Sequence, residues 1–236
     1  MRAIILAAGV GKRLKPLTDS LPKCLIKING QMLIERHIKY LKECGIKDII
    51  IVTGHLKELI TKTLGNKDQG IKFIYNPDYK KGSVASLYAA RDGLGSDCLV
   101  MDADVYFEKR VLERLIRSPH KNCFLIDSSC SNTGEEMMIA IINNRVTAIE
   151  RGLKGKFDLI GEGVGFAKIS EPTAKDLRAV LEDFISRGNV ESEYEESLNE
   201  LVKKDVFGCE KADDLKWTEI DFIDDIKKAE RIASGA

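Results

Sequence analysis

The chain has 236 residues, of which 44% are hydrophobic, 31% charged and 6% aromatic. This composition is typical of a globular protein with a full core, and it excludes a disordered or collagen-like chain. Because 37 lysines and arginines balance 37 aspartates and glutamates, we expect neither nucleic acid nor an anionic membrane as the main partner. Any phosphate site must therefore be local, and the length suits a single domain.

The cysteines and the N-terminus indicate the compartment. Six cysteines are scattered without a C-x-x-C pair, which favours buried thiols in a reducing compartment over a zinc site or a disulfide framework. The apolar run at the N-terminus is too short for a signal peptide, because Lys12, Arg13 and Lys15 follow it at once. No stretch approaches the ~20 apolar residues of a membrane span. We therefore expect a cytoplasmic protein.

Short apolar runs alternate with amphipathic segments through roughly the first 130 residues, which predicts an α/β fold with a parallel sheet. The expected strands are Ala3–Ala7, Asp48–Thr53, Lys72–Tyr75, Cys98–Met101 and Cys123–Ile126. The expected helices are Met32–Cys44, Leu56–Leu64, Ser83–Leu94 and Lys109–Arg117. Right-handed crossovers would give a Rossmann-like, doubly wound sheet with helices on both faces, which binds ligands at the carboxyl ends of its strands.

The pattern changes after residue 130. Met137–Ile142 and Arg145–Ile149 predict a small antiparallel hairpin, because the Asn143-Asn144 turn between them tolerates positive φ. A further strand, Gly163–Ile169, follows. Helices are then expected at residues 171–187, at residues 194–204 and from residues 221–225 to Ile232. With no repeat or linker in view, we expect this part to complete one domain, residues 1–236.

The segment after the first strand has the composition of a phosphate-binding loop. Small residues and glycines (Leu6, Ala7, Ala8, Gly9, Gly11) precede or flank the cations Lys12 and Arg13. Glycines let backbone N–H groups approach an anion, and Arg and Lys add charge-assisted hydrogen bonds. Neither a dinucleotide fingerprint nor a Walker A loop fits the spacing. On the bare G-x-G alone, a glycine-rich turn with solvated cations would be the alternative.

The longer string L-A-A-G-V-G-K-R-L-K-P-L-T, followed by L-P-K-C-L at residues 21–25, resembles the signature of nucleotidyltransferases that couple a nucleoside triphosphate to a sugar phosphate or a phosphorylated alcohol. The resemblance implies a nucleotidyltransferase fold in which this loop wraps the triphosphate. It also implies that Arg13 contacts the β and γ phosphates and that Lys23 binds phosphate near the reacting centre. By itself, Lys23 could be an exposed loop lysine.

Two acids follow the strand that ends near Met101. Asp102 and Asp104 lie two residues apart, so in an extended chain their side chains share a face. Carboxylate oxygens suit Mg²⁺, which uses one or two protein carboxylates together with substrate phosphates. Helix-capping or turn aspartates are the alternative. The resemblance makes Asp104 the first choice as metal ligand and Asp102 the second, with Asp102 near the nucleotide.

A second metal-binding acid is expected late in the chain. The W-T-E-I-D segment at residues 217–221 resembles the family's late W-x-E-I-D segment, which implies that Asp221 completes the Mg²⁺ site with Asp104. Residues 80–86, which include Gly82 and Ser83, would meet the nucleotide base. The alternative role for Ser83 is a helix N-cap.

The segments at residues 161–170, 194–198 and 217–221 resemble the small branch of the family that uses CTP with phosphocholine, aminoethylphosphonate, inositol phosphate and similar acceptors. The resemblance implies Mg²⁺-dependent, in-line attack on the α-phosphate of CTP with release of pyrophosphate. Candidate acceptor-binding residues are Glu162, Tyr194 and Trp217. A solvated surface is the alternative role for Glu162, and core packing is the alternative for Trp217. The oligomeric state stays open.

Other functions fit parts of these patterns. A hexose-1-phosphate nucleotidyltransferase that uses UTP, dTTP or GTP would share the loop and the acids. D-x-D at residues 102–104 also occurs in metal-dependent glycosyltransferases of similar architecture. A catalytically inactive nucleotide-binding module is the alternative outside enzymes, because a fold alone never proves activity.

Overall fold

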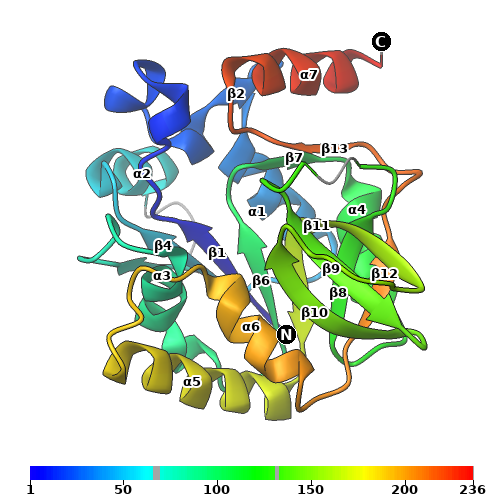
Figure 1. Cartoon of the computed structure of the whole chain (residues 1–236). Coiled ribbons are helices and arrows are strands. Elements are labelled where there is room, and N and C mark those ends of the chain that lie inside the picture. The colour runs from blue at the N-terminus through cyan, green and yellow to red at the C-terminus, as the bar shows by residue number, and fades with distance from the viewer. Residues whose placement is uncertain (66–69, 131–132, 236) are drawn as a thin grey trace.

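The computed structural model describes residues 1–65, 70–130 and 133–235. Within these residues a nine-stranded sheet runs in the order β10-β9-β11-β6-β1-β4-β5, and β8 and β12 continue it from β11 (Figure 1). Its strands are β1 (Arg2–Ala7), β4 (Ile49–Thr53), β5 (Ile71–Tyr75), β6 (Cys98–Asp102), β8 (Cys123–Asp127), β9 (Met137–Ile142), β10 (Arg145–Arg151), β11 (Leu159–Ile169) and β12 (Gly208–Lys211). Strands from both parts of the chain therefore share one sheet.

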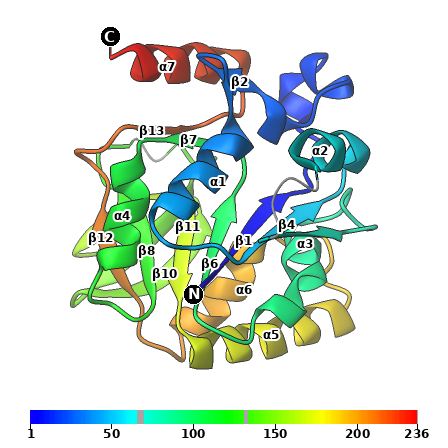
Figure 2. The ribbon, with the colours of Figure 1, turned by 180° about the vertical axis from the view of Figure 1, so that it is seen from behind.

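Helices cover both faces of this sheet, because its central strands are apolar on both sides. Ile5 of β1 joins one buried cluster with α1 (Leu33–Glu43), α2 (Lys57–Leu64) and α4 (Lys109–Arg117). Ile4 joins the cluster on the opposite face with α3 (Ser83–Ala89), α5 (Glu171–Ser186) and α6 (Tyr194–Val202). Figures 1 and 2 show these two layers from opposite sides.

A smaller cluster covers the carboxyl end of the parallel strands. The last helix, α7 (Ile223–Ser234), packs with residues of the N-terminal loop region such as Leu14 and Ile26. Two short ladders lie here: β2 (Lys27–Ile28) with β3 (Gln31–Met32), and β7 (Val105–Phe107) with β13 (Trp217–Glu219). The β7–β13 ladder brings the end of the chain to the loop after β6, where ligands of such sheets bind.

The predicted fold class is confirmed, including helices on both faces and the antiparallel hairpin β9–β10. Its turn residues Asn143 and Asn144 both have positive φ, of 51° and 58°. All six cysteines are free. Among the described residues no helix is long and apolar enough to span a membrane.

The sequence did not predict which strands pair. The strand β8 lies beside β11, which separates it from β6 and runs antiparallel to both. Two predicted boundaries were wrong. The helix predicted at Ser83–Leu94 ends at Ala89 and is followed by a 3₁₀ turn, Arg91–Gly93. A side chain at Gly93 would lie 2.7 Å from Ile50, so the chain packs closely on the sheet at this turn. The strand predicted from Gly163 begins at Leu159, where it pairs with β9.

Candidate active site

The glycine loop follows β1 and is fixed by contacts with its neighbours. Gly11 has a φ of 64°, and its carbonyl accepts a hydrogen bond of 2.7 Å from the Thr18 hydroxyl. The backbone N–H of His55 donates to the carbonyl of Ala8 at 3.0 Å, and the His55 ring lies 2.9 Å from the carbonyl of Thr18. These contacts place Lys12 and Arg13 on a 3₁₀ turn at the carboxyl end of the sheet.

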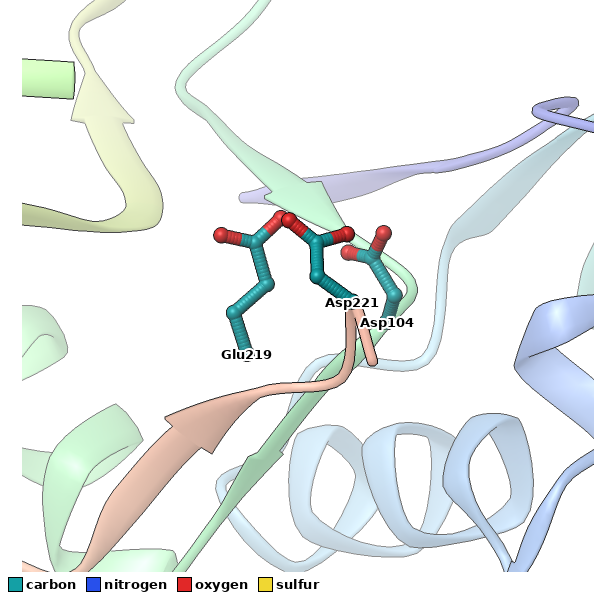
Figure 3. A group of neighbouring side chains, drawn as sticks. All are labelled: Asp104, Glu219 and Asp221. Atoms are coloured by element: carbon teal, nitrogen blue, oxygen red, sulfur yellow. The ribbon is translucent and has the colours of Figure 1, made fainter. Parts of the chain in front are cut away.

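Three acids gather beside this loop. Asp104 follows β6, and Glu219 and Asp221 lie at the end of β13. One carboxylate oxygen from each residue lies within 4.8 Å of the other two, and Figure 3 shows the three side chains converging. Desolvation of the Glu219 carboxyl and the charges of Asp104 and Asp221 raise the pKa of Glu219 from 4.5 to about 8. Hard oxygen ligands at this spacing fit a divalent cation such as Mg²⁺.

Lys23 connects two of these acids. Its Nζ lies 2.6 Å from Asp104 Oδ2 and 2.6 Å from Asp221 Oδ1. Burial acts to lower the pKa of Lys23, but the attraction of Asp104 and Asp221 outweighs it, so the pKa lies above its ordinary value. Arg13 forms an ion pair with the other oxygen of Asp221 and stacks over Phe222, with 5.2 Å to the ring centroid. The structure therefore brings together Arg13, Lys23, Asp104 and Asp221, which the sequence places up to 208 positions apart.

Asp102, the second choice as a metal ligand, does not join this acid cluster. Its carboxylate accepts a hydrogen bond of 2.9 Å from the hydroxyl of Tyr194. Burial, followed by the charges of Glu195 and Asp104, raises the pKa of Asp102 well above its ordinary range. The reason is local geometry, because a turn follows β6 directly and the two side chains no longer share one face of a strand.

Gly82 and Ser83 lie at the start of α3. The alternative role considered for Ser83, a helix N-cap, is excluded because Gly82 is the N-cap residue. The Ser83 hydroxyl instead accepts a hydrogen bond of 2.8 Å from the backbone N–H of Tyr194. A side chain at Gly82 would lie 2.0 Å from the carbonyl oxygen of Ser192, so this position requires glycine for close packing.

A cavity of about 550 Å³ opens beside the acids. The three predicted acceptor-binding residues, Glu162, Tyr194 and Trp217, all line it. The indole N–H of Trp217 donates to Asp127 at 3.0 Å, which fixes the ring at the wall. The cavity is strongly acidic, because nine carboxylates line it against three cationic side chains among the described residues. The acids are Asp102, Asp127, Glu135, Glu136, Glu162, Glu195, Glu219, Asp221 and Asp225, and the cations are Arg13, Arg151 and Lys228.

The family model for the MobA-like NTP transferase domain matches residues 3–154, which span the glycine loop, Lys23, Asp102 and Asp104. The chain belongs to this family. It is a nucleotidyltransferase, as the resemblance of its motifs led us to expect. The remaining acids, Glu219 and Asp221, lie outside the matched residues.

Relatives cover the whole chain. The choline-phosphate cytidylyltransferase of Streptococcus pneumoniae is 33% identical over 98% of both chains. The 2-aminoethylphosphonate cytidylyltransferase of Lancefieldella rimae is 30% identical over 77% of this chain and 72% of its own. The solved structure of CTP:phosphocholine cytidylyltransferase from Streptococcus pneumoniae matches with a TM-score of 0.79 at 28% identity, over 98% of both chains.

Glu219 is the member of the acid cluster that sequence reasoning missed. It is the last residue of β13, two positions before Asp221, which lies just past the end of that strand. The i, i+2 spacing that drew attention to Asp102 and Asp104 also occurs at residues 219–221 and was the signal that could have found Glu219. At residues 219–221 both acids join the cluster, whereas at residues 102–104 only Asp104 does.

Proposed function

We propose that this transferase moves a cytidylyl group from CTP to a small phosphorylated alcohol or phosphonate, with Mg²⁺. An oxygen of the acceptor's phosphate or phosphonate forms a bond to the α-phosphorus, and the bond from that phosphorus to the pyrophosphate oxygen breaks. The observation that carries this proposal is the meeting of the acid cluster with Lys23 and the glycine loop. No covalent intermediate on the protein is needed, since positioning and charge neutralisation suffice.

Different residues would bind the triphosphate, the nucleoside and the reacting phosphates. Backbone groups at residues 6–11 and the cations Lys12 and Arg13 would hold the triphosphate, and Gly82, Ser83 and Asp102 would lie near the nucleoside. Lys23 would neutralise charge at the reacting phosphates. Asp104, Asp221 and Glu219 supply a set of oxygens that fits Mg²⁺. When bound there, the ion would reduce the repulsion between the two anionic substrates.

The choice of CTP is supported by the relatives, whose names specify cytidylyl transfer to choline phosphate and to 2-aminoethylphosphonate. The cavity supports an acceptor of the same kind. Two of its three cations are already paired, Arg13 with Asp221 and Arg151 with Glu193. The carboxylates that remain, with Glu162 and Glu195 among them, favour an acceptor that carries an ammonium group beside its phosphate.

Glu162 is the strongest candidate for the ammonium contact. Burial, and then the charges of Glu136 and Asp127, raise its pKa above the ordinary value. Its carboxylate has neither a hydrogen bond nor an ion pair with any residue that the structure describes. An N–H-bearing cation in the cavity would therefore find in Glu162 an acceptor for charge-assisted hydrogen bonds.

A pyrophosphate-release assay tests the proposal. CTP, UTP, GTP and dTTP are each combined with phosphocholine, phosphoethanolamine, 2-aminoethylphosphonate, inositol 1-phosphate and glucose 1-phosphate, with and without Mg²⁺. We expect CTP with an ammonium-bearing acceptor to give the highest kcat/KM, at least about tenfold above glucose 1-phosphate. Highest turnover with glucose 1-phosphate and UTP or dTTP would favour a hexose-1-phosphate nucleotidyltransferase instead. Binding of CTP without turnover of any acceptor would favour the inactive nucleotide-binding module.

A further inference from the structure

The first residue of α6 connects two parts of the site that come from different elements. Tyr194 is 4% exposed, and both of its polar hydrogens are used. Its hydroxyl donates to Asp102 Oδ2 at 2.9 Å, and its backbone N–H donates to Ser83 Oγ at 2.8 Å. One residue thus joins the end of β6 to the start of α3.

Asp102 is held from several sides. A ring nitrogen of His37 lies 3.0 Å from the carbonyl oxygen of Asp102. Gly165 of β11 has a φ of 80°, and a side chain there would lie 2.6 Å from Asp102 Oδ2. The next residue, Ala103, donates its backbone N–H to the carbonyl of Leu6 at 3.2 Å. These contacts fix Asp102 at the entrance to the turn that carries Asp104, two residues further on.

The segment before Tyr194 lies closely against the start of α3. The backbone N–H of Gly82 donates to the carbonyl of Val190 at 2.9 Å, and that of Val84 donates to the carbonyl of Ser192 at 3.1 Å. Gly82 has no room for a side chain against Ser192. Residues 190–194 thus form a fixed strut between the turn at residues 82–84 and Asp102.

We propose that Tyr194 is a positioning residue, whose hydroxyl orients Asp102 and through it Asp104, while its backbone holds the turn at residues 82–84. The next residue, Glu195, lines the cavity that we assign to the acceptor. Residues 190–195 therefore connect this cavity to the turn at residues 82–84, which we assign to the nucleoside, and to Asp102 beside the acid cluster. This inference rests on the proposed function, which makes those two assignments. The ring of Tyr194 packs in the buried cluster with or without its hydroxyl. The positioning role that we propose therefore belongs to the hydroxyl, which binds Asp102.

The Tyr194→Phe variant removes only that hydroxyl. We expect kcat to fall about tenfold, while KM for CTP and for the acceptor changes by less than about threefold, as for a residue that acts through a neighbour of the metal ligands. Tyr40→Phe is the matched control, because its hydroxyl also takes part in one hydrogen bond, with Arg36 at 2.9 Å, away from the cavity. Asp102→Asn keeps an oxygen that accepts the Tyr194 hydrogen bond, so it should lose less kcat than Asp102→Ala does.

A second readout does not need turnover. Trp217 is the chain's single tryptophan and lies two residues before Glu219, so its fluorescence can report Mg²⁺ binding to the acid cluster. Tyr194→Phe should raise the half-saturating Mg²⁺ concentration about tenfold, and Tyr40→Phe should leave it unchanged. If the wild-type protein turns over no acceptor, the proposed function fails. The Mg²⁺ titration then still tests Tyr194, because a positioning role predicts weaker Mg²⁺ binding in Tyr194→Phe and not in Tyr40→Phe.

A double-mutant cycle completes the test. Asp102→Ala removes the acceptor of the same hydrogen bond. If Tyr194→Phe does not fold, the kcat and the Mg²⁺ titration of Asp102→Ala still test whether this bond matters. With the positioning role, Tyr194→Phe combined with Asp102→Ala should be no worse than Asp102→Ala alone. Additive losses, or a Tyr194→Phe variant with normal kcat and a normal Mg²⁺ titration, would overturn the proposal.

Discussion

The two sides of the site differ both in charge and in construction. The proposed triphosphate side comes from one continuous stretch, the glycine loop and Lys23, and its charged side chains at residues 12, 13, 15 and 23 are cations. The cavity side is assembled from β8, β9, β10, β11, α6 and β13, and carboxylates dominate it. A chain whose formal net charge is zero thus separates its charges across a single site.

This separation matches the charges of the two proposed substrates. A triphosphate needs cations and backbone N–H groups, whereas an ammonium-bearing acceptor needs carboxylates. The boundary between the two sides is the acid cluster, where Lys23 already contacts both Asp104 and Asp221. Substitutions on each side should therefore affect different kinetic constants, and those at the boundary should affect all of them.

The largest effect is expected at the boundary. Asp104→Asn and Asp221→Asn should each abolish Mg²⁺-dependent pyrophosphate release, because each removes a charged oxygen ligand from the cluster. Glu219→Gln should follow with a loss of about 10²-fold. Asp102→Asn should be milder, within about tenfold, since it lies outside the cluster. EDTA should abolish the activity of the wild-type protein.

The control for this set is Asp224→Asn. Asp224 lies on α7 close to the cluster in sequence, but its side chain is exposed and pairs with Lys227. It should keep wild-type activity. Retained turnover in EDTA, or in Asp104→Asn at saturating CTP, would contradict metal-assisted transfer at these acids.

The cations of the triphosphate side should give the next largest effect. Lys23→Ala and Arg13→Ala should each reduce turnover by about 10²-fold, because preorganised charges at the reacting phosphates stabilise the transition state. Both variants should fold, as shown by a cooperative thermal transition. Lys27→Ala, at an exposed position on β2, is the control. Near-normal turnover of either variant at saturating CTP and Mg²⁺ would remove that residue from the proposed site.

The same contrast explains how much could be predicted from the sequence. The glycine loop, Lys23 and Asp104 lie in short segments that resemble the motifs of the family, and the structure brings Lys23 and Asp104 together. The core strands and helices were also predictable, because two-sided apolar runs mark strands buried on both faces. The strand order could not be predicted, because nothing local to Cys123–Asp127 shows that β11 would separate it from β6.

The cavity could be predicted only in part for the same physical reason. Glu162, Tyr194 and Trp217 come from three elements, and their approach depends on how β11, α6 and β13 pack. The hydroxyl of Tyr194 points to Asp102, a pairing across 92 positions that no spacing rule reports. Short strands such as β7 and β13 are likewise stabilised by their partner and carry a weak pattern of their own.

A smaller effect is expected on the cavity side. Glu162→Gln should raise KM for an ammonium-bearing acceptor about tenfold, because it replaces a charge-assisted hydrogen bond by a neutral one. KM for CTP should stay unchanged, and so should KM for inositol 1-phosphate if that acceptor is used. Glu150→Gln on the neighbouring strand β10, at an exposed position, is the control. An equal rise of KM for charged and uncharged acceptors would argue against an ammonium contact.

The smallest effect concerns stability and the second cavity acid, Glu195. Burial raises the pKa of Glu195 from 4.5 to about 8. Between these two values the folded protein binds a proton that the unfolded chain does not, so this residue makes stability fall as the pH rises toward 8. Glu195→Gln has no such proton to lose, and we expect its Tm to exceed that of the wild type increasingly as the pH rises.

Thermal unfolding of both proteins between about pH 5 and about pH 8 checks this, with Glu230→Gln, exposed on α7, as the control. A difference of ~1 kcal/mol would raise Tm by about 2–4 °C in a chain of this length. A Tm difference that does not change with pH would contradict the raised pKa. Because an ammonium ligand favours the charged form of Glu195, saturating acceptor should stabilise the wild type more than the variant near pH 8. The cavity acid would then reduce the stability of the free protein and increase that of the complex, as expected of a residue retained for binding.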